Sequence, residues 1–330
     1  MDRSRRELGK LALTALPASW ALARVPVSAF ASIDSKIKGV QIGAITYSFR
    51  TIPNADDIIK AYQTIGLGEM ELMSNHAEAL AGAPPGPGRA GGPGGRRGGA
   101  PGGGRAALTP EEQAARDAAI KTLHDWRMAA SASTFAPVRK KIADAGIDLR
   151  LLCYNMNVRT TQDDEIEYAF KMAEWLGVKA ISTSTQVSMA KRLAPFSDKH
   201  KMLVGFHGHA NLTDPDEVAK PESFAAVMAA SKYHAANMDI GHYTEAGYDP
   251  VAFIQQHHAR ITNLHLKDKK KAANGGGNTP WGQGDTAIKD VLKLLQKNKW
   301  DIPANVEFEY DGDPLVEIPK CLQYCKDALA

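Results

Sequence analysis

Four short apolar runs in the second half of the chain each end in a residue that can bind a metal ion. These residues are His207, Asp239, His265 and Glu307, and they follow one another at about the spacing of strand–helix units. Imidazole and carboxylate groups together suit Mn²⁺, Mg²⁺, Co²⁺ or Zn²⁺. In a parallel barrel the C-terminal ends of the strands meet on one face, so the four side chains would converge. The pattern therefore predicts one divalent-metal site.

Two of these residues have a partner two positions further along the chain. His209 follows His207 and Glu309 follows Glu307, so both members of each pair point to the same side of an extended strand. One member of each pair can bind a metal ion while the other faces a substrate or solvent. A set of buried, hydrogen-bonded polar residues in the mouth of a barrel is the non-catalytic alternative.

The elements that would position these residues alternate between strand and helix from residue 38 onward. Eight strands with intervening helices favour a parallel sheet, and this number favours a closed (β/α)8 TIM barrel in a single α/β domain over residues 38–330. The expected strands are 39–48, 68–73, 148–155, 178–184, 201–207, 235–240, 261–266 and 304–310. The expected helices are 54–65, 109–128, 135–145, 164–176, 189–193, 222–231, 250–257, 288–298 and 314–329.

Two segments lie outside this alternation. Residues 81–105, after the second strand, are almost entirely Gly, Pro, Ala and Arg, and we expect them to be disordered, with an RNA-binding Gly-Arg segment as the alternative. Residues 1–31 combine a twin arginine (Arg5 and Arg6), an apolar stretch and small residues at Ala29 and Ala31. This order resembles a twin-arginine signal peptide and predicts a periplasmic or otherwise extracytoplasmic protein with no stable membrane span after cleavage.

Composition excludes several classes of protein. The hydrophobic content of 44% and charged content of 23% are ordinary for a globular domain, and a net charge of +3 gives no basis for nucleic-acid binding. The three cysteines, Cys153, Cys321 and Cys325, are an odd number, so they cannot all pair within the chain, and we expect buried thiols. A homo-oligomer is compatible with this composition.

A series of motifs from residue 38 to residue 330 resembles the xylose-isomerase-like barrels of the sugar phosphate isomerase/epimerase group, and most of all its exported bacterial members. The motifs occur in the order of the family and lie at strand ends and in one loop. They are Gly39-Val40-Gln41, Tyr47-Ser48-Phe49-Arg50, Gly68 to Leu72 with Glu71, His207-Gly208-His209, Asp239-x-x-His242, His265-x-Lys267-Asp268, Trp281-Gly282-Gln283-Gly284-Asp285 and Glu307-Phe308-Glu309-Tyr310.

The resemblance implies one divalent cation, most often manganese, bound by Glu, Asp, His and Glu from late strands. Asp239, His265 and Glu307 match three of these positions, which favours Glu307 over Glu309 as a ligand. His207 stands where the family has its first Glu. This departure implies either a site of two histidines and two carboxylates or a substrate-binding role for His207.

The resemblance also implies that His242 contacts a substrate oxygen next to the metal. Other residues are candidates for catalysis and substrate binding because of their own chemistry and their places on the expected strands and loops. The candidate catalytic residues are Glu71, His209 and Lys267, and the further substrate contacts are Tyr47, Arg50, His242, Trp281 and Glu309. Three alternatives remain open. Glu71 can form an ion pair with Arg50, Lys267 can be a solvated member of a basic run, and Tyr47 can pack in the core.

The implied chemistry is removal of a proton next to a metal-polarised carbonyl of a carbohydrate or keto-sugar, leading to isomerisation or epimerisation. Elimination from a 3-keto-glycoside or an inosose-like polyol is the first alternative, and a non-catalytic sugar-binding barrel is the second. Hydrolysis of a glycoside by Glu71 and Glu307 is a weaker possibility because His residues surround them. A multi-metal endonuclease would need a richer set of His and Glu across more strands, and the third and fourth predicted strands (148–155 and 178–184) supply none.

Overall fold

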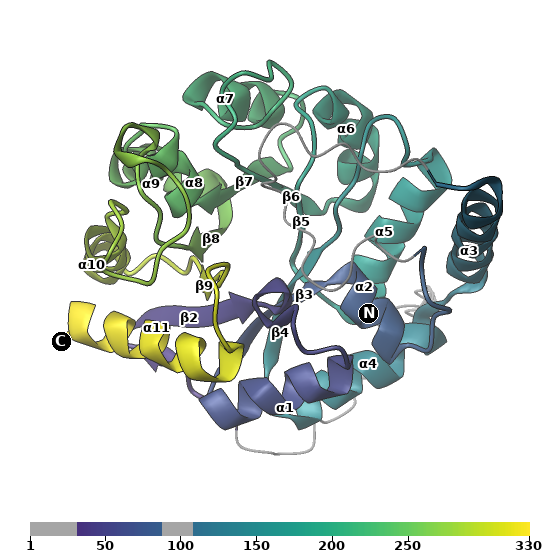
Figure 1. Cartoon of the computed structure of the whole chain (residues 1–330), viewed down its shortest axis with the longest axis horizontal. Helices are drawn as coiled ribbons and strands as arrows, with labels where there is room; N and C mark the ends of the chain where they lie inside the picture. The colour runs from purple at the N-terminus through teal and green to yellow at the C-terminus, as the bar shows by residue number, and fades with distance from the viewer. Residues whose placement is uncertain (1–31, 88–107) are drawn as a thin grey trace, which may run out of the picture.

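A computed structural model describes residues 32–87 and 108–330, and its central feature is a closed ring of eight parallel strands (Figure 1). Each strand pairs with its neighbour in sequence, and β9 pairs with β2 to close the barrel. The predicted (β/α)8 fold is therefore confirmed. The strands are β2 (Val40–Ile45), β3 (Glu69–Met73), β4 (Asp148–Cys153), β5 (Ala180–Thr183), β6 (Leu203–His207), β7 (His234–Asp239), β8 (Ile261–Leu266) and β9 (Ala304–Val306).

Helices surround this ring on the outside (Figure 1). Alternate strand residues such as Leu72, Phe206, Met238 and Leu264 are at most 2% exposed and belong to the apolar core, which also includes residues of the helices. The α-helices are α1 (Ala55–Ile65), α2 (Ser74–Leu80), α3 (Pro110–Ala129), α4 (Ala132–Asp144), α5 (Asp163–Leu176), α6 (Met189–His200), α7 (Pro221–Ala229), α8 (Ile240–Glu245), α9 (Pro250–His257), α10 (Ile288–Asn298) and α11 (Pro314–Ala328). The 3-10 helices are η1 (Thr46–Phe49), η2 (His258–Arg260) and η3 (Ala272–Asn274).

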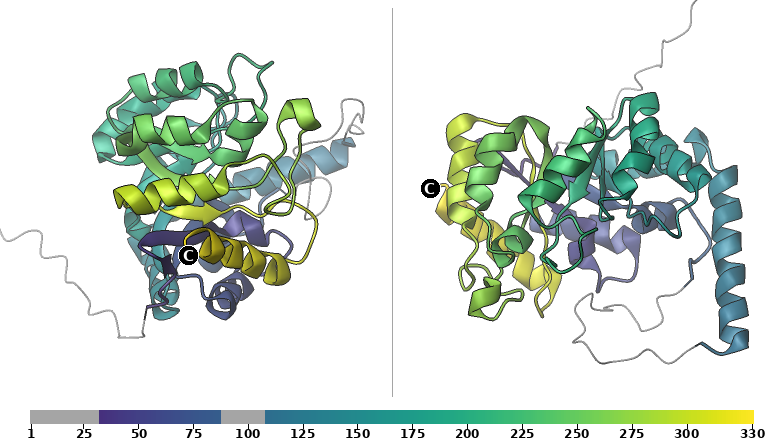
Figure 2. Two further views of the ribbon diagram at one scale, coloured as in Figure 1. Left: turned by 90° about the vertical axis from the view of Figure 1, so that its left-hand side faces the viewer. Right: turned by 90° about the horizontal axis from the view of Figure 1, so that it is seen from above.

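The helix boundaries follow from local signals in the sequence. At the start of α3, Thr109 and Glu112 form a reciprocal capping box with Pro110 as the first helical residue. The side chain of Asn54 caps α1, which ends at Gly66 in the left-handed conformation. Figure 2 shows α3 at the flank of the barrel, where it packs beside α5.

Two predicted strands are shorter than expected because one serine interrupts both. The segment predicted as strand to residue 48 leaves the sheet at Ile45 and forms η1. The hydroxyl of Ser48 donates to the carbonyl of Val306 and accepts from the backbone N–H of Phe308, at 2.9 Å in both cases. These side-chain hydrogen bonds take the place of backbone hydrogen bonds between the two strands. β9 therefore ends at Val306 and not at residue 310.

Three short elements were not predicted, and one helix is longer than expected. β1 (Lys36–Ile37) pairs antiparallel with β2. α2 and α8 begin directly after the strand ends and are too short to show a helical period. α6 continues to His200 beyond Pro195, because this proline removes only one helical donor while Leu193 and Ser197 are buried in the interior.

The first residues of the Gly/Pro-rich segment have a defined path. The backbone N–H groups of Ala81 and Ala83 donate to carbonyls of α2, and this path continues to Pro87. Residues 88–105 of the segment and the predicted signal peptide at residues 1–31 lie outside the described residues. Within the described ranges, no helix has the length and apolarity needed to cross a membrane. The three cysteines are buried and unpaired, as predicted.

Candidate metal centre

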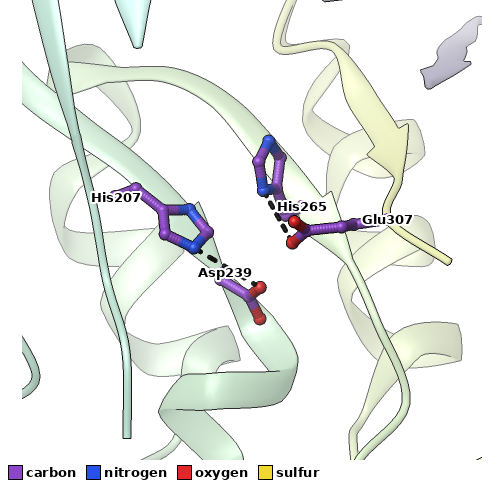
Figure 3. A group of neighbouring side chains, drawn as sticks. All are labelled: His207, Asp239, His265 and Glu307. Atoms are coloured by element: carbon purple, nitrogen blue, oxygen red, sulfur yellow. Dashed lines mark hydrogen bonds and ion pairs between the residues drawn. The ribbon is translucent and has the colours of Figure 1, made fainter. Parts of the chain in front are cut away.

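The four predicted ligands lie together at the C-terminal ends of four neighbouring strands. His207 and Asp239 are the last residues of β6 and β7, His265 is the fifth residue of β8, and Glu307 directly follows β9. One ligand atom from each residue lies within 4.8 Å of all the others, and all four residues are buried. Figure 3 shows the two imidazoles and two carboxylates facing a common centre.

The donor atoms are oriented by their own surroundings. The carboxylate of Asp239 caps α8, because its Oδ1 accepts the backbone N–H of His242 at 2.8 Å. Its Oδ2 is left facing the centre, 4.0 Å from Nε2 of His207. On the other side, Nδ1 of His265 lies 3.0 Å from Oε2 of Glu307 (Figure 3). Hydrogen bonds thus position Asp239, His265 and Glu307, and His207 lies beside Asp239.

These residues fit a divalent cation. Burial, reinforced by the charge of His265, lowers the pKa of His207 well below its ordinary value, so the ring is neutral, as a metal ligand must be. Its buried Nδ1 has no hydrogen-bond partner among the described residues. A mixed imidazole and carboxylate set is used by Zn²⁺, Mn²⁺ and Co²⁺. His207, Asp239, His265 and Glu307 are the residues that would hold such an ion.

Lys267 places a buried ammonium group directly beside this centre. It is 2% exposed, and its Nζ lies 3.0 Å from Asp239 Oδ2, 2.8 Å from Glu307 Oε2 and 2.6 Å from Glu309 Oε2. Burial alone would lower the pKa of Lys267, but the three carboxylates outweigh it and raise the pKa well above its ordinary value. The solvated alternative is therefore wrong. The group is a protonated hydrogen-bond donor and not a base with a depressed pKa.

Glu71 lies beneath the metal centre and not in the open mouth. Its carboxylate is fully buried, and Oε2 lies 2.7 Å from Nε2 of His265. The predicted ion pair with Arg50 is wrong, because the guanidinium of Arg50 donates to the carbonyl of Phe308 and covers the ring of Tyr47 at 5.4 Å. A carboxylate on the far nitrogen of a ligand histidine fixes the ring orientation and raises its basicity.

Three asparagines hold Glu71 in this position. Asn237, Asn263 and Asn305 direct their Nδ2 atoms at its carboxylate, at 3.4, 2.8 and 3.2 Å, and Ser182 donates to the same group. Each asparagine stands two residues before a ligand, on β7, β8 and β9. The period of two along a strand therefore places them one layer below the ligands, facing the same interior. We did not predict this layer, although the repeated spacing of Asn and ligand was a readable signal.

His209 forms a pair with a carboxylate that the sequence analysis missed. Its Nδ1 lies 2.6 Å from Oε1 of Glu217, and its Nε2 lies 3.2 Å from the hydroxyl of Ser184. The ring of His209 is 4.8 Å from that of His207, centroid to centroid, and remains partly exposed. A carboxylate that orients one nitrogen of a histidine while the other faces the mouth is the arrangement of a general base. Glu217 lies in an irregular loop, where no periodic signal marks it.

His242 lies on the same side of the mouth and is neutral. Burial lowers its pKa to about 3, with a further contribution from Lys267. Its Nδ1 is 3.3 Å from Nζ of Lys269, which forms a 2.7 Å ion pair with Glu245. The rings of His209 and His242 are 5.4 Å apart. A neutral imidazole here can exchange hydrogen bonds with a hydroxyl or carbonyl oxygen.

The aromatic residues of the Tyr47-to-Arg50 motif and of the Trp281 loop motif lie in different places. Phe49 is fully buried and packs against Tyr62 at 5.1 Å, so it belongs to the core. Tyr47 is half-buried beneath Arg50. Trp281 lies in the loop between β8 and α10 and makes an edge contact with Tyr324 of α11 at 5.7 Å.

No family model matches the chain, and no curated protein is similar to it in sequence. Solved structures share its fold. The probable 3-DHS dehydratase AsbF from Bacillus anthracis has a TM-score of 0.58 at 15% identity, covering 88% of this chain and 98% of its own. A sugar phosphate isomerase/epimerase from Parabacteroides distasonis has a TM-score of 0.55 at 14% identity, covering 90% of this chain and 98% of its own. The IolI protein, solved with a zinc atom, has a TM-score of 0.56 at 12% identity, covering 88% of this chain and 96% of its own. The chain therefore has the fold of xylose-isomerase-like barrels.

Proposed function

We propose that this protein is a divalent-metal-dependent isomerase or epimerase that moves a proton next to a carbonyl of a small carbohydrate or keto-sugar. The observation that carries the proposal is the buried group of His207, Asp239, His265 and Glu307, whose ligand atoms lie within 4.8 Å of one another. Proteins of the same fold bear the names of sugar isomerases, which supports the class of substrate.

Each further residue of the mouth has a part in this chemistry. A divalent cation on the four ligands would act as a Lewis acid toward a carbonyl or a pair of hydroxyls. His209 accepts the proton from the adjacent carbon at Nε2, while Glu217 fixes its ring through Nδ1. The ammonium of Lys267, whose three donors contact Asp239, Glu307 and Glu309, places positive charge beside the ligands and stabilises negative charge that develops there through its electric field. Return of the proton by His209 to the neighbouring carbon gives an isomer, whereas an epimer requires a proton delivered to the opposite face by a second donor or by water.

Elimination is the second candidate, and the spacing of two histidines favours it. His209 and His242 lie 5.4 Å apart on one mouth, so one ring can accept a proton while the other hydrogen-bonds to a leaving oxygen. The named activity of the dehydratase with this fold is of the same type. Expulsion of a β-substituent from a 3-keto-glycoside or an inosose-like polyol would then follow proton removal. A non-catalytic sugar-binding barrel would bind the same ligands without turnover.

The cellular compartment of the protein determines which sugars it can meet. We propose that residues 1–31 direct the protein across the membrane, on the basis of the twin arginine, the apolar stretch and the small residues before residue 32. Unphosphorylated keto-sugars, polyols and glycosides are then more accessible substrates than sugar phosphates. N-terminal sequencing of protein recovered from the periplasm should begin near residue 32, and an intact N-terminus in the cytoplasm would contradict export.

The test combines metal content with proton exchange. Elemental analysis of the purified protein should give about one Mn, Co, Zn or Mg per chain in the wild type and in the surface control His124→Ala. The same analysis should show little metal in His265→Ala and Glu307→Ala. The wild type should also incorporate deuterium from D2O next to the carbonyl of a keto-sugar in a panel followed by NMR. No metal in the wild type after reloading, or bound metal with no exchange on any sugar, would overturn the proposal.

A further inference from the structure

Two histidines at the mouth of the barrel, His209 and His242, make contacts of opposite kinds through Nδ1. Nδ1 of His209 lies 2.6 Å from a carboxylate oxygen of Glu217, whereas Nδ1 of His242 lies 3.3 Å from the ammonium nitrogen of Lys269. We propose that these contacts fix opposite tautomers, so that His209 presents an acceptor to the substrate and His242 presents a hydrogen-bond donor. Lys269 is then the positioning residue that makes His242 a donor. The consequence for catalysis rests on the proposed function, whereas the tautomers do not.

The contact of His209 with Glu217 leaves the other ring nitrogen as the acceptor. An ionised carboxylate only accepts hydrogen bonds, so Nδ1 of His209 carries the proton that it donates to Glu217. A neutral imidazole has one protonated nitrogen, and Nε2 therefore keeps a lone pair. The hydroxyl of Ser184, 3.2 Å from Nε2, can donate to this lone pair. An imidazole in this form is able to act as a general base.

The contact of His242 with Lys269 has the reverse consequence. A lysine ammonium has three donors and no acceptor, and an imidazolium ring also has only donors. A hydrogen bond from Nζ of Lys269 to Nδ1 of His242 therefore requires a neutral ring with its lone pair on Nδ1 and its proton on Nε2. Within the described residues Nε2 has no hydrogen-bond partner, and the side chain of His242 is 16% exposed. This N–H group is available to a substrate oxygen.

Glu245 is the group that would impose the other tautomer on His242, and Lys269 prevents it. Oε2 of Glu245 lies 3.8 Å from Nδ1 of His242, which is beyond hydrogen-bond length. The same oxygen lies 2.7 Å from Nζ of Lys269, and Oε1 accepts the backbone N–H of Gly277 at 2.8 Å. Both carboxylate oxygens therefore have a partner already. Without the ammonium of Lys269, the carboxylate would favour a proton on Nδ1.

The loop that follows β8 holds Lys269 in this position. Lys269 is 6% exposed, its backbone N–H donates to Oγ1 of Thr286 at 3.0 Å, and it forms an antiparallel bridge with Asn278. Gly276 has a φ of +65°, and a Cβ there would lie 2.7 Å from Oε1 of Glu245. Glycine thus allows the loop to approach Glu245 closely. The loop fixes both the ammonium and the carboxylate that flank His242.

The two tautomers assign separate roles to the two rings. The rings lie 5.4 Å apart, centroid to centroid, at 72°. His209 takes the proton from a substrate carbon at Nε2, while His242 donates a hydrogen bond from Nε2 to an oxygen on a neighbouring carbon. His242 keeps its proton and stabilises negative charge that develops on this oxygen. The pair therefore fits a substrate in which the acidic C–H group lies next to a carbon that carries a carbonyl or hydroxyl oxygen.

NMR of the histidine rings tests the tautomers directly. Long-range proton–nitrogen correlation spectra of isotopically labelled protein distinguish a protonated from an unprotonated ring nitrogen. The spectra are recorded on metal-free and Zn²⁺-loaded protein at about pH 8, above the ordinary pKa of histidine. Loss of signals in His209→Gln and His242→Gln identifies the two rings. We expect the proton on Nδ1 in His209 and on Nε2 in His242, and the opposite tautomer at either ring would overturn the proposal.

Variants of Lys269 test its positioning role by the same spectra. Lys269→Met should move the proton of His242 to Nδ1, toward Glu245. Lys269→Arg should keep the proton on Nε2, because a guanidinium also has only donors. Lys270→Met, at the exposed neighbouring position, is the matched control and should leave both rings unchanged. A ring of His242 that stays protonated on Nε2 in folded Lys269→Met would show that another group sets the tautomer.

Deuterium exchange links the tautomer of His242 to the proposed function. On a keto-sugar that the wild type exchanges, Lys269→Met should slow the exchange by about 10²- to 10³-fold at unchanged metal content, the usual effect of losing one donor to a developing oxyanion. Lys269→Arg should recover most of the rate. An unchanged rate in Lys269→Met with the proton on Nδ1 would overturn the donor role of His242. The expected tautomers in a protein that exchanges no sugar proton would establish the role of Lys269 and overturn the proposed function.

Discussion

Oε2 of Glu71 lies 2.7 Å from Nε2 of His265, so a fully buried carboxylate holds the far nitrogen of a histidine whose near nitrogen faces the metal centre. Burial alone would lower the pKa of His265, but the charges of Glu71 and Glu307 raise it well above the ordinary value. The carboxylate therefore strengthens the histidine as a base toward whatever cation it meets. Glu71 is thus a positioning residue that acts through His265.

Glu71→Gln should weaken metal binding by about 10- to 100-fold, the usual effect of losing the outer partner of a ligand histidine. The amide of the variant carries no negative charge. Its NH2 group faces N–H and O–H donors whose hydrogen bonds the carboxylate of Glu71 accepts in the wild type. Competition titration with a chelator measures the affinity. Glu78→Gln is the matched control, since Glu78 is equally buried but pairs with Arg127 elsewhere. Equal affinities in wild type and Glu71→Gln would contradict the positioning role.

Asn263→Leu should destabilise the fold by about 1–3 kcal/mol, because it removes a donor from the buried carboxylate of Glu71 and leaves that acceptor less satisfied. The Nδ2 of Asn263 makes the shortest of the three asparagine contacts, at 2.8 Å. Urea denaturation of the metal-free protein measures the change. Asn298→Leu, on the exposed end of α10, should stay within about 0.5 kcal/mol. A similar stability for both variants would show that the asparagine layer does not support Glu71.

Lys267→Met should destabilise the metal-free protein by about 3–5 kcal/mol, because it leaves the buried Asp239 and Glu307 and the half-buried Glu309 without their shared cation. A divalent cation should then raise the melting temperature of the variant more than that of the wild type. Thermal melts with and without EDTA and added Mn²⁺ or Zn²⁺ measure both effects. Lys270→Met, at an exposed position, should behave like the wild type. An unchanged metal-free melting temperature would refute the charge argument.

His209→Asn should lower the rate of proton exchange by about 10²- to 10⁴-fold while the metal content stays at the wild-type level. Glu217→Gln should give a smaller loss, because it keeps the ring in place but removes the charge that stabilises its protonated form. Isotope exchange followed by NMR, together with elemental analysis, separates the two effects. Full exchange activity in His209→Asn would assign the base to another residue.

Acid should destabilise the protein partly through His76. Burial lowers the pKa of His76 to about 4, and Nδ1 lies 2.9 Å from the hydroxyl of Thr46. Between pH 6.5 and 4, His76 takes up a proton in the unfolded chain but stays neutral in the folded protein. The free energy of unfolding therefore falls as pH falls. The loss reaches about 2 kcal/mol at pH 5. Denaturation curves at pH 7 and pH 5 should show a smaller difference in His76→Gln than in the wild type. The half-buried control His124→Gln on α3 should change the difference less than His76→Gln does, and a wild-type difference in His76→Gln would contradict the assignment.

Much of the fold could be predicted because it depends on local patterns. The strand–helix alternation and the caps at Asn54, Thr109 and Gly66 are readable within a few residues. One error falls where a distant residue changes a local preference. β9 is shorter than its apolar run because the hydroxyl of Ser48, 260 residues earlier in the chain, accepts a hydrogen bond from the backbone N–H of Phe308.

The candidate site, like the fold, could be predicted from the sequence only where it depends on local patterns. The sequence alone indicated the types of the four ligands and their placement at strand ends, since both follow from residue chemistry and the period of two. Only the tertiary structure decided that Glu71 supports His265 from below, that Glu217 orients His209, and that Lys267 is a buried cation. Glu71 and His265 are 194 residues apart, and they meet only because the barrel closes. A local pattern fixes which side of a strand a residue faces, whereas the closed barrel fixes which residues share that space.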